Sequence, residues 1–436
     1  METFYNFLTR QFRQVYLNNS KITMYKFRRL LRLCIDIPLL LIAIPCILLL
    51  RFLSLWKIIR LEELDISRIG GAYNADWYLC GKAKGLIKKE FIDVFYFSKS
   101  NSIVGNLFWL QLWRRTLSVF PFSRLIDIVD RLNRCFLGWE KYTINVPDLV
   151  CVNNSHDPHA NLLKAVLNTK YPFVNFTKEE EKQGKAKLAE MGVKENSRFI
   201  CFHARDSSYL NKIQPARDFT YHDFRDSSIS NYLLAAEEMT ERGLYAIRTG
   251  AVVKQKLQIN NSMLIDYATN GHRSEFMDIY LGSKCYFFIC SDTGISIVPE
   301  VFRRPIVFVN WALLGRLSTY VLNAILVPKK IFLRRENRLL TFKEILNSPI
   351  VSARRGDIFK QMGLDVIENT PEEILEATLE MYQRLTGQWK VIPEDEQLQN
   401  AFWKLYGPEK IRSTDFRISA AFLRNNRKLL EETVAK

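Results

Sequence analysis

The residues best suited to chemistry in this chain follow an apolar run at positions 199–202. That run leads directly into His203, Ala204, Arg205 and Asp206. Open α/β sheets bind ligands outside the carboxyl ends of their strands, so a polar cluster after a predicted strand is a candidate site. Arg205 offers a rigid fork of donors for phosphate oxygens, and His203 can donate a further hydrogen bond. The cluster therefore predicts a site for an anionic ligand.

A second polar cluster follows the apolar run 285–290 and opens a predicted helix. Its sequence is Ser291-Asp292-Thr293-Gly294-Ile295-Ser296. Free backbone N–H groups at the start of a helix bind anions, and a glycine lets a ligand approach the backbone closely. We therefore predict that Ser291, Thr293, Gly294 and Ser296 contribute to the same anion site as the first cluster.

Ordinary structural roles also explain these two clusters. Arg205 could pair with Asp206 or another acid at the end of the sheet, and His203 could be a hydrogen-bonded core histidine. Ser291 or Thr293 could simply cap a helix. Two such clusters in one predicted sheet favour ligand binding over these alternatives.

Two further predicted strands end in polar residues, at Arg248-Thr249-Gly250 and at Asp266-Tyr267-Ala268. Arg248 could contact a phosphate group, and Tyr267 could stack on a base or a ribose. The structural alternatives are an ion pair for Arg248 and a position at the edge of the core for Tyr267. The sequence leaves both pairs of alternatives open.

Other kinds of site find little support. Residues 153–159 contain two histidines and an aspartate, but their spacing matches no known metal arrangement and their composition suits a turn, so we predict no metal site. The chain has no complete Walker loop and no dinucleotide-binding glycine fingerprint, and we predict no cofactor. Its 8 cysteines lack paired short spacings, which is typical of reduced core residues.

The composition, with 48% hydrophobic and 25% charged residues, is that of a folded protein. From position 199 onward, apolar strand patterns alternate with helical patterns, which predicts right-handed crossovers and a parallel sheet in an α/β fold. The predicted strands are 199–203, 244–248, a short strand ending at 266, 285–290 and 306–309, and the predicted helices are about 227–242, 273–283 and 295–303.

At 436 residues the chain is long enough for two or three domains. We predict a basic, membrane-associated arm, a first α/β domain that binds the acceptor, a charged connector, a second α/β domain that binds the donor, and a C-terminal helical region that packs back on the body. In order these regions are 1–60, 61–170, 171–198, 199–345 and 346–436. Thr177 with Glu180 and Thr370 before Pro371 predict two helix starts.

The formal net charge is +16, and residues 1–60 hold ten Lys or Arg against two acids. This basic arm flanks the apolar segment 37–56, which contains Pro38 and Pro45. A basic flank beside an apolar segment is typical of contact with anionic lipid. The segment could be a re-entrant or interfacial anchor, a full span or a buried core helix. Because half of the excess charge lies in this arm, we expect no nucleic-acid partner.

Taken together, these motifs resemble a family of bacterial proteins identified as glycosyltransferases. The resemblance covers about residues 60–345. It depends on Arg68-Ile69-Gly70, the His203–Asp206 cluster with Ser207-Ser208-Tyr209-Leu210, Arg248-Thr249-Gly250, Asp266-Tyr267-Ala268, and Ser291-Asp292-Thr293-Gly294 with Pro305 and Asn310. It implies the glycosyltransferase B fold, which has two Rossmann-like domains facing a cleft. His203 and Arg205 are similar to a motif with which fucosyltransferases hold the donor diphosphate.

The resemblance implies a nucleotide-sugar donor on the C-terminal domain and an acceptor on the N-terminal domain. Together with the basic arm and its apolar segment, this predicts a membrane-associated glycosyltransferase at the cytoplasmic face of the bacterial inner membrane. Its donor would be a nucleoside-diphosphate sugar as co-substrate, and its acceptor a surface glycan or a lipid-linked glycan. Arg68 and Tyr209 belong to the expected site, and Asp76 and Asp206 are candidates for the general base. One departure is Gly71, where the family pattern leads us to expect a histidine. It favours the alternative of a non-catalytic nucleotide- or glycan-binding scaffold at the membrane.

Overall fold

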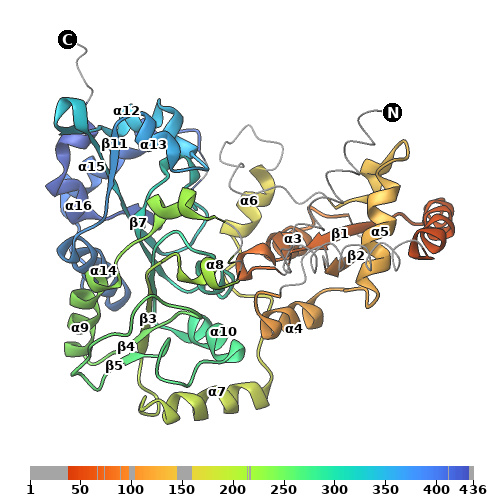
Figure 1. Ribbon diagram of the computed structural model, residues 1–436, viewed down its shortest axis with the longest axis horizontal. Helices are drawn as coiled ribbons and strands as arrows, with labels where there is room; N and C mark the ends of the chain where they lie inside the picture. Colours follow the sequence, from red (N-terminus) through yellow and green to blue (C-terminus); the bar gives the residue numbers. More distant parts are fainter. Residues whose placement is uncertain are drawn as a thin grey trace, which may run out of the picture. The chain divides into compact units, whose positions relative to one another are not determined.

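The computed structural model describes residues 38–65, 67–72, 74–88, 90–97, 104–144, 160–213, 215, 218–410 and 412–431 (Figure 1). The chain forms two compact units, each assembled from separate stretches of sequence. The smaller unit contains residues 1–64, 89–102 and 117–145, and the larger unit contains 65–88, 103–116 and 146–436. The predicted first domain, 61–170, is therefore divided between the two units. Sequence patterns could not show this, because they give no information on which distant segments pack together.

The larger unit is built on a seven-stranded sheet with the order β12-β8-β7-β6-β3-β4-β5. All neighbouring strands in it are parallel, which confirms the predicted α/β fold with a parallel sheet. From β3 the chain adds β4 and β5 on one side and then β6, β7 and β8 on the other. The strand order therefore reverses between β3 and β6, where doubly wound sheets bind their ligands. The strands are β3 (Phe199–His203), β4 (Tyr245–Arg248), β5 (Leu264–Asp266), β6 (Phe288–Cys290), β7 (Ile306–Trp311), β8 (Ala324–Pro328) and β12 (Phe416–Ile418).

The central strands are continuous apolar runs because helices cover both faces of the sheet. Every residue of β6, β7 and β8 is buried. The helices of the larger unit are α3 (Asn74–Ala83), α4 (Leu107–Thr116), α6 (Ala160–Leu167), α7 (Lys178–Glu190), α8 (Ser208–Ile213), α9 (Leu233–Glu241), α10 (Glu275–Lys284), α11 (Ile297–Val301), α12 (Phe342–Leu346), α13 (Asp357–Gln361), α14 (Pro371–Thr386), α15 (Pro393–Tyr406) and α16 (Ala420–Asn425). Thr177 and Thr370 form capping boxes at the starts of α7 and α14, as predicted.

The C-terminal region packs back on the larger unit, and α14 contacts α9, α16 and β8 (Figure 1). It is not purely helical, because it contributes β12 to the main sheet. It also contributes β11 (Leu364–Ile367), which pairs with β9 (Lys330–Leu333) beside the short β10 (Arg338–Leu339). The predicted boundary at residue 345 therefore falls inside one continuous structure.

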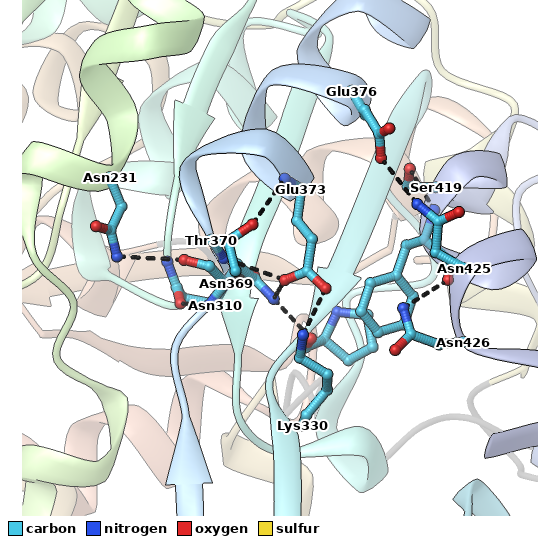
Figure 2. A network of polar contacts seen from close by, with 12 residues as sticks. Asn231, Asn310, Lys330, Asn369, Thr370, Glu373, Glu376, Ser419, Asn425 and Asn426 are labelled. Carbon is cyan, nitrogen blue, oxygen red and sulfur yellow. Dashed lines mark hydrogen bonds and ion pairs between the residues drawn. The ribbon is translucent and has the colours of Figure 1, made fainter. Parts of the chain in front are cut away.

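Two asparagines join the start of α14 to the end of β7 (Figure 2). The backbone N–H of Asn369 donates to Oδ1 of Asn310 at 2.7 Å, and the backbone N–H of Asn310 donates to Oδ1 of Asn369 at 2.5 Å. Asn310 adopts a left-handed backbone with φ of 55°, which asparagine tolerates better than most residues. This reciprocal pair is fully buried, so it fixes where α14 crosses the sheet.

The smaller unit contains β1 (Ile59–Leu64), β2 (Ile92–Phe97), α5 (Ser123–Asn133) and a helix at residues 38–53. Its strands β1 and β2 are parallel and form a two-stranded sheet. The predicted second Rossmann-like domain is not seen in the described part of this unit and stays a prediction. None of the described helices combines the length and the apolar character that a membrane crossing requires.

Candidate functional site

A cavity of about 590 Å³ lies in the larger unit, next to the carboxyl ends of β3 and β6. This is the reversal point of the strand order, where the doubly wound architecture leaves a crevice between diverging loops. Eight of the residues predicted for the site line this cavity, namely Arg68, His203, Arg205, Asp206, Tyr209, Thr293, Gly294 and Ser296. Polar clusters separated by 90 residues of sequence therefore share one cavity.

Arg205 enters the cavity already bound to protein groups. One of its terminal nitrogens donates to Asp226 Oδ1 and to the backbone carbonyl of His222. Arg205 therefore forms the ion pair that the sequence left open as an alternative, but its partner is Asp226 and not Asp206. Burial, together with the nearby charge of Arg225, lowers the pKa of Arg205 to about 10. The guanidinium remains charged at neutral pH, and the repulsion between the two cations favours an anion that contacts both.

Arg225 is a cation of the site that sequence patterns did not indicate. Its guanidinium pairs with Asp292 at 2.9 Å and donates to the Asp292 carbonyl at 3.0 Å. Its Nε is buried without a hydrogen-bond partner in the described structure. A buried donor without an acceptor is costly, so a ligand oxygen at this position would be stabilising. Arg225 lies in the turn Thr220–Arg225, which has no apolar pattern that could have marked it.

His203 lines the cavity and is hydrogen-bonded to the backbone at Thr249. Its Nδ1 lies 2.9 Å from the carbonyl oxygen of Thr249. A carbonyl can only accept, so Nδ1 must carry the proton of the ring. Burial lowers the pKa of the His203 imidazole, which favours the neutral ring with a lone pair on Nε2. In this state Nε2 would accept a hydrogen bond from a ligand hydroxyl, whereas the predicted donor role would require a protonated ring.

Glu300 has a carboxyl group that lines the cavity. Its oxygens accept hydrogen bonds from Ser296 Oγ at 2.9 Å and from the Tyr320 hydroxyl at 3.2 Å. Burial raises the pKa of Glu300 to about 7, although these two hydroxyl donors oppose the shift. A carboxylate with a pKa near neutrality is well suited to accept a proton. Glu300 lies in α11, one helical turn after Ser296, which directly precedes the helix. This spacing of four residues is a signal that could have been read from the sequence.

The predicted helix start after Asp292 is a short turn, Gly294–Ser296, followed by the five-residue α11. The Ser296 hydroxyl also lies 2.9 Å from the Thr293 carbonyl. Ser296 is thus occupied by protein groups on both sides. Of this cluster, Thr293 and Gly294 remain the better candidates for ligand contacts.

The loop that carries Arg68 has no room for a side chain at position 71. A Cβ on Gly71 would lie 2.4 Å from the Asp65 carbonyl oxygen and 2.8 Å from the Asp65 carboxyl carbon. The histidine expected from the family pattern could not be accommodated unless the backbone moved. Asp65, Arg68 and Gly71 all line the cavity, so the carboxylate of Asp65 occupies the space beside this position.

Arg68 and Arg316 are the cations of the cavity that have no acidic partner among the described residues. Neither makes a side-chain hydrogen bond there either. Arg273 also lines the cavity but pairs with Asp278 at 2.7 Å. Sequence patterns did not indicate Arg273 or Arg316, since neither follows a predicted strand directly. Arg273 lies in a loop, and Arg316 ends the short 3-10 turn Leu314–Arg316.

Arg248 and Tyr267, which could have contacted a ligand, instead bind protein groups. Arg248 donates to the carbonyl of Gln255 at 2.7 Å and lies 3.4 Å from Asp266. The Tyr267 hydroxyl donates to Asp278 at 2.9 Å. Both side chains are almost fully buried, and neither lines the cavity.

Asp76 and Ser291 also lie outside the cavity lining. Both oxygens of Asp76 accept hydrogen bonds from Arg303, at 2.9 and 3.1 Å, in a buried pair. Burial raises the pKa of Asp76, while the charge of Arg303 opposes this shift. Ser291 is fully buried and accepts a hydrogen bond from the backbone of Arg205. Their positions indicate supporting roles for both residues.

In the described part of the chain, no group of histidine, cysteine and acidic side chains is arranged to hold a metal ion. The segment 153–159, with its two histidines, lies outside the described residues.

No family model and no curated protein matches the chain. Its fold is similar to that of a glycosyl transferase of family 9 from Veillonella parvula DSM 2008, with 10% identity and a TM-score of 0.44, over 75% of this chain and 97% of that chain. It is also similar to the ADP-heptose lps heptosyltransferase II of E. coli, with 12% identity and a TM-score of 0.33, over 62% of this chain and 90% of that chain.

Proposed function

We propose that this chain is a glycosyltransferase that moves a sugar from a nucleoside-diphosphate sugar to an acceptor. The acceptor is a bacterial surface glycan or a glycan linked to a lipid. The observation that supports this most is the meeting of Arg205, Arg225 and neutral His203 in one large cavity at the reversal point of a doubly wound sheet. A diphosphate suits the two guanidinium groups, and a sugar or ribose hydroxyl suits Nε2 of His203.

The reaction needs stabilisation of a departing diphosphate. As the bond between the anomeric carbon and the diphosphate oxygen breaks, that oxygen keeps the electron pair and negative charge grows on it. Fixed cations in a cavity stabilise this growing charge more than they stabilise the bound donor. Arg205 and Arg225 supply that charge, and we propose that transfer proceeds without a metal ion.

The acceptor hydroxyl must lose its proton as its oxygen bonds to the anomeric carbon. We propose that Glu300 takes this proton, since it lines the cavity and its carboxylate is held by Ser296 and Tyr320. Asp206 is the second candidate. Its oxygens accept backbone hydrogen bonds from Ser208 at 2.8 Å and Lys254 at 3.1 Å, which leaves it better placed to shape the loop.

Turnover of a panel of nucleoside-diphosphate sugars by the purified protein tests the proposal. Arg205→Ala should weaken donor binding roughly 10- to 100-fold, because a hydrogen bond to a charged group contributes about 1.5–3 kcal/mol. Arg242→Ala is the matched control, since Arg242 pairs with Glu238 on the surface of α9. Donor binding that is the same in wild type and Arg205→Ala would remove Arg205 from the site.

A non-catalytic scaffold that binds nucleotides or glycans is the second candidate. The crowding around Gly71 favours it, because a catalytic histidine at this position could not be accommodated. Calorimetry that shows donor binding, combined with no hydrolysis and no transfer to any acceptor, would support the scaffold over the enzyme.

A further inference from the structure

The helix at residues 38–53 of the smaller unit is apolar on every face as far as Leu50, yet the described residues cover only one side of it. Ala43, Ile47 and Leu50 are buried, at 0%, 1% and 8% exposure. Their spacing of four and three residues follows one side of the helix. They pack against a core that includes Leu61, Tyr96, Val129 and Tyr142, so the helix lies along the body of its unit beside β1 and α5.

The opposite side of this helix is a continuous apolar surface that extends into the following turn. Exposure ranges from 52% to 76% for Leu41, Ile44, Leu48, Leu49, Phe52, Leu55 and Trp56. Soluble proteins seldom leave a contiguous apolar patch of this kind uncovered. A partner with an apolar interior is therefore expected to cover it.

A second element extends the same surface. The guanidinium of Arg51 donates to the Leu137 carbonyl at 3.1 Å and to the side chain of Asn133 at 3.0 Å. It also lies 5.2 Å from the centre of the Phe136 ring. These contacts bring the turn after α5 to the end of the helix. Leu137 is 98% exposed and Phe136 is 44% exposed, so the turn presents two further apolar side chains.

The sequence on both sides of the helix is basic. Residues 1–60 hold ten Lys or Arg against two acids, and Arg51, Lys57 and Arg60 are at or just after the end of the helix. Lys141 follows the turn at Leu137, while Arg131 and Arg134 before it pair with Asp127 and Asp130 at 2.8 and 2.7 Å. The guanidinium of Arg134 also lies 5.5 Å from the centre of the Trp139 ring. Basic residues next to exposed aliphatic and aromatic side chains are typical of surfaces that enter the boundary layer of an anionic bilayer.

We propose that the helix at 38–53, the turn up to Trp56, and Phe136 with Leu137 form one lipid-docking surface, which inserts into a membrane containing anionic lipid. The helix lies along the bilayer with its covered stripe on the protein, and Leu137 inserts as a separate point of contact. This inference does not depend on the cavity or on its proposed reaction.

Sedimentation of the full-length protein with vesicles tests the inference. We expect binding to vesicles of phosphatidylcholine mixed with phosphatidylglycerol, and weaker binding to phosphatidylcholine alone. Leu48→Asp and Leu137→Asp should each weaken binding at least tenfold, which corresponds to about 1.4 kcal/mol. Val391→Asp is the matched control, because Val391 is 63% exposed but belongs to the larger unit. Thermal unfolding and nucleotide binding should be the same in all variants.

Three results would overturn the inference. The first is equal binding of wild type, Leu48→Asp and Leu137→Asp to the anionic vesicles. The second is a dimer, seen by light scattering, that Leu48→Asp converts to a monomer, since a second copy would then be the partner. The third is hydrogen exchange at residues 38–56 that is already slow without vesicles and becomes fast when residues 1–37 are deleted.

Discussion

The backbone N–H of Arg205 donates a hydrogen bond to Oγ of Ser291 at 3.0 Å, which ties the loop after β3 to the loop after β6. Ser291 is fully buried, so the bond is protected from water. The two polar clusters of the cavity thus form one connected structure. The position of the Arg205 guanidinium depends on a serine that does not itself reach the cavity.

Ser291→Ala should therefore weaken nucleotide binding although it removes no cavity-lining group. It leaves the N–H of Arg205 buried without a partner, which costs about 1–3 kcal/mol. Thermal unfolding will show the loss of stability, and calorimetry with the donor will show the loss of affinity. Unfolding and affinity equal to those of the wild type would mean that the loop is held by other contacts.

The kcat/KM of the wild type should fall as the pH falls below about 7, because Glu300 then becomes protonated and can no longer act as the base. Glu300→Gln should remove this acid limb from the pH profile. The variant should be roughly 10²- to 10⁴-fold slower, with no such limb, if Glu300 is the base. A variant that keeps the acid limb would assign the proton transfer to another group.

The same substitution makes a separate prediction for stability, since burial raises the pKa of Glu300 from 4.5 to about 7. Between these values the folded chain holds a proton that the unfolded chain has released. The contribution of Glu300 to stability therefore falls as the pH rises through this window. Glutamine has no proton to release, so its stability should not change with pH in this way. The stability of Glu300→Gln minus that of wild type should therefore increase between pH 4.5 and about 7, as measured by thermal unfolding.

Gly71→Ala should be far more disruptive than Gly70→Ala, although the two glycines are adjacent. A Cβ at position 71 would lie 2.4 Å from a backbone oxygen, whereas at position 70 the nearest atom would be at 3.5 Å. Overpacking of this kind costs about 1–3 kcal/mol. Nucleotide binding and thermal unfolding of both variants provide the comparison. Equal behaviour of the two would show that the 65–71 loop moves freely enough to accept a side chain.

Asp76→Asn should destabilise the fold without moving the pH profile. It leaves the Arg303 guanidinium buried without its counter-charge, a change that costs about 3–5 kcal/mol in comparable pairs. Chemical denaturation will measure the loss. A shift of the pH profile in Asp76→Asn would instead return Asp76 to the role of general base.

The alternation of apolar and helical patterns predicted most of the main sheet. Runs such as 199–203 and 306–309 are apolar because both faces of the sheet are covered, and this leaves a clear signal in the sequence. The short edge strand Phe416–Ile418 gave no such signal. It belongs to the sheet only because it pairs with β8, from which it is separated by almost ninety residues.

The candidate site was predictable to the extent that its residues directly follow strands. His203, Arg205, Thr293 and Gly294 do so, and all four line the cavity. Arg248 follows a strand as well, yet its side chain is held by Asp266 and the chain at Gln255, because the neighbouring loop folds over it. The packing of the loops determines which polar residues face the cavity. Sequence periodicity does not predict loop packing.

The backbone of Arg68 lies against Gly105, where a Cβ would come within 2.8 Å of the Arg68 Cα. The position of Arg68 therefore requires a glycine at position 105, which has no side chain to displace it. A mutation that adds a single methyl group there would leave every ionisable residue in place and still displace one of the cavity's cations. Comparisons between related chains that consider only charged and hydroxyl residues would overlook such a change.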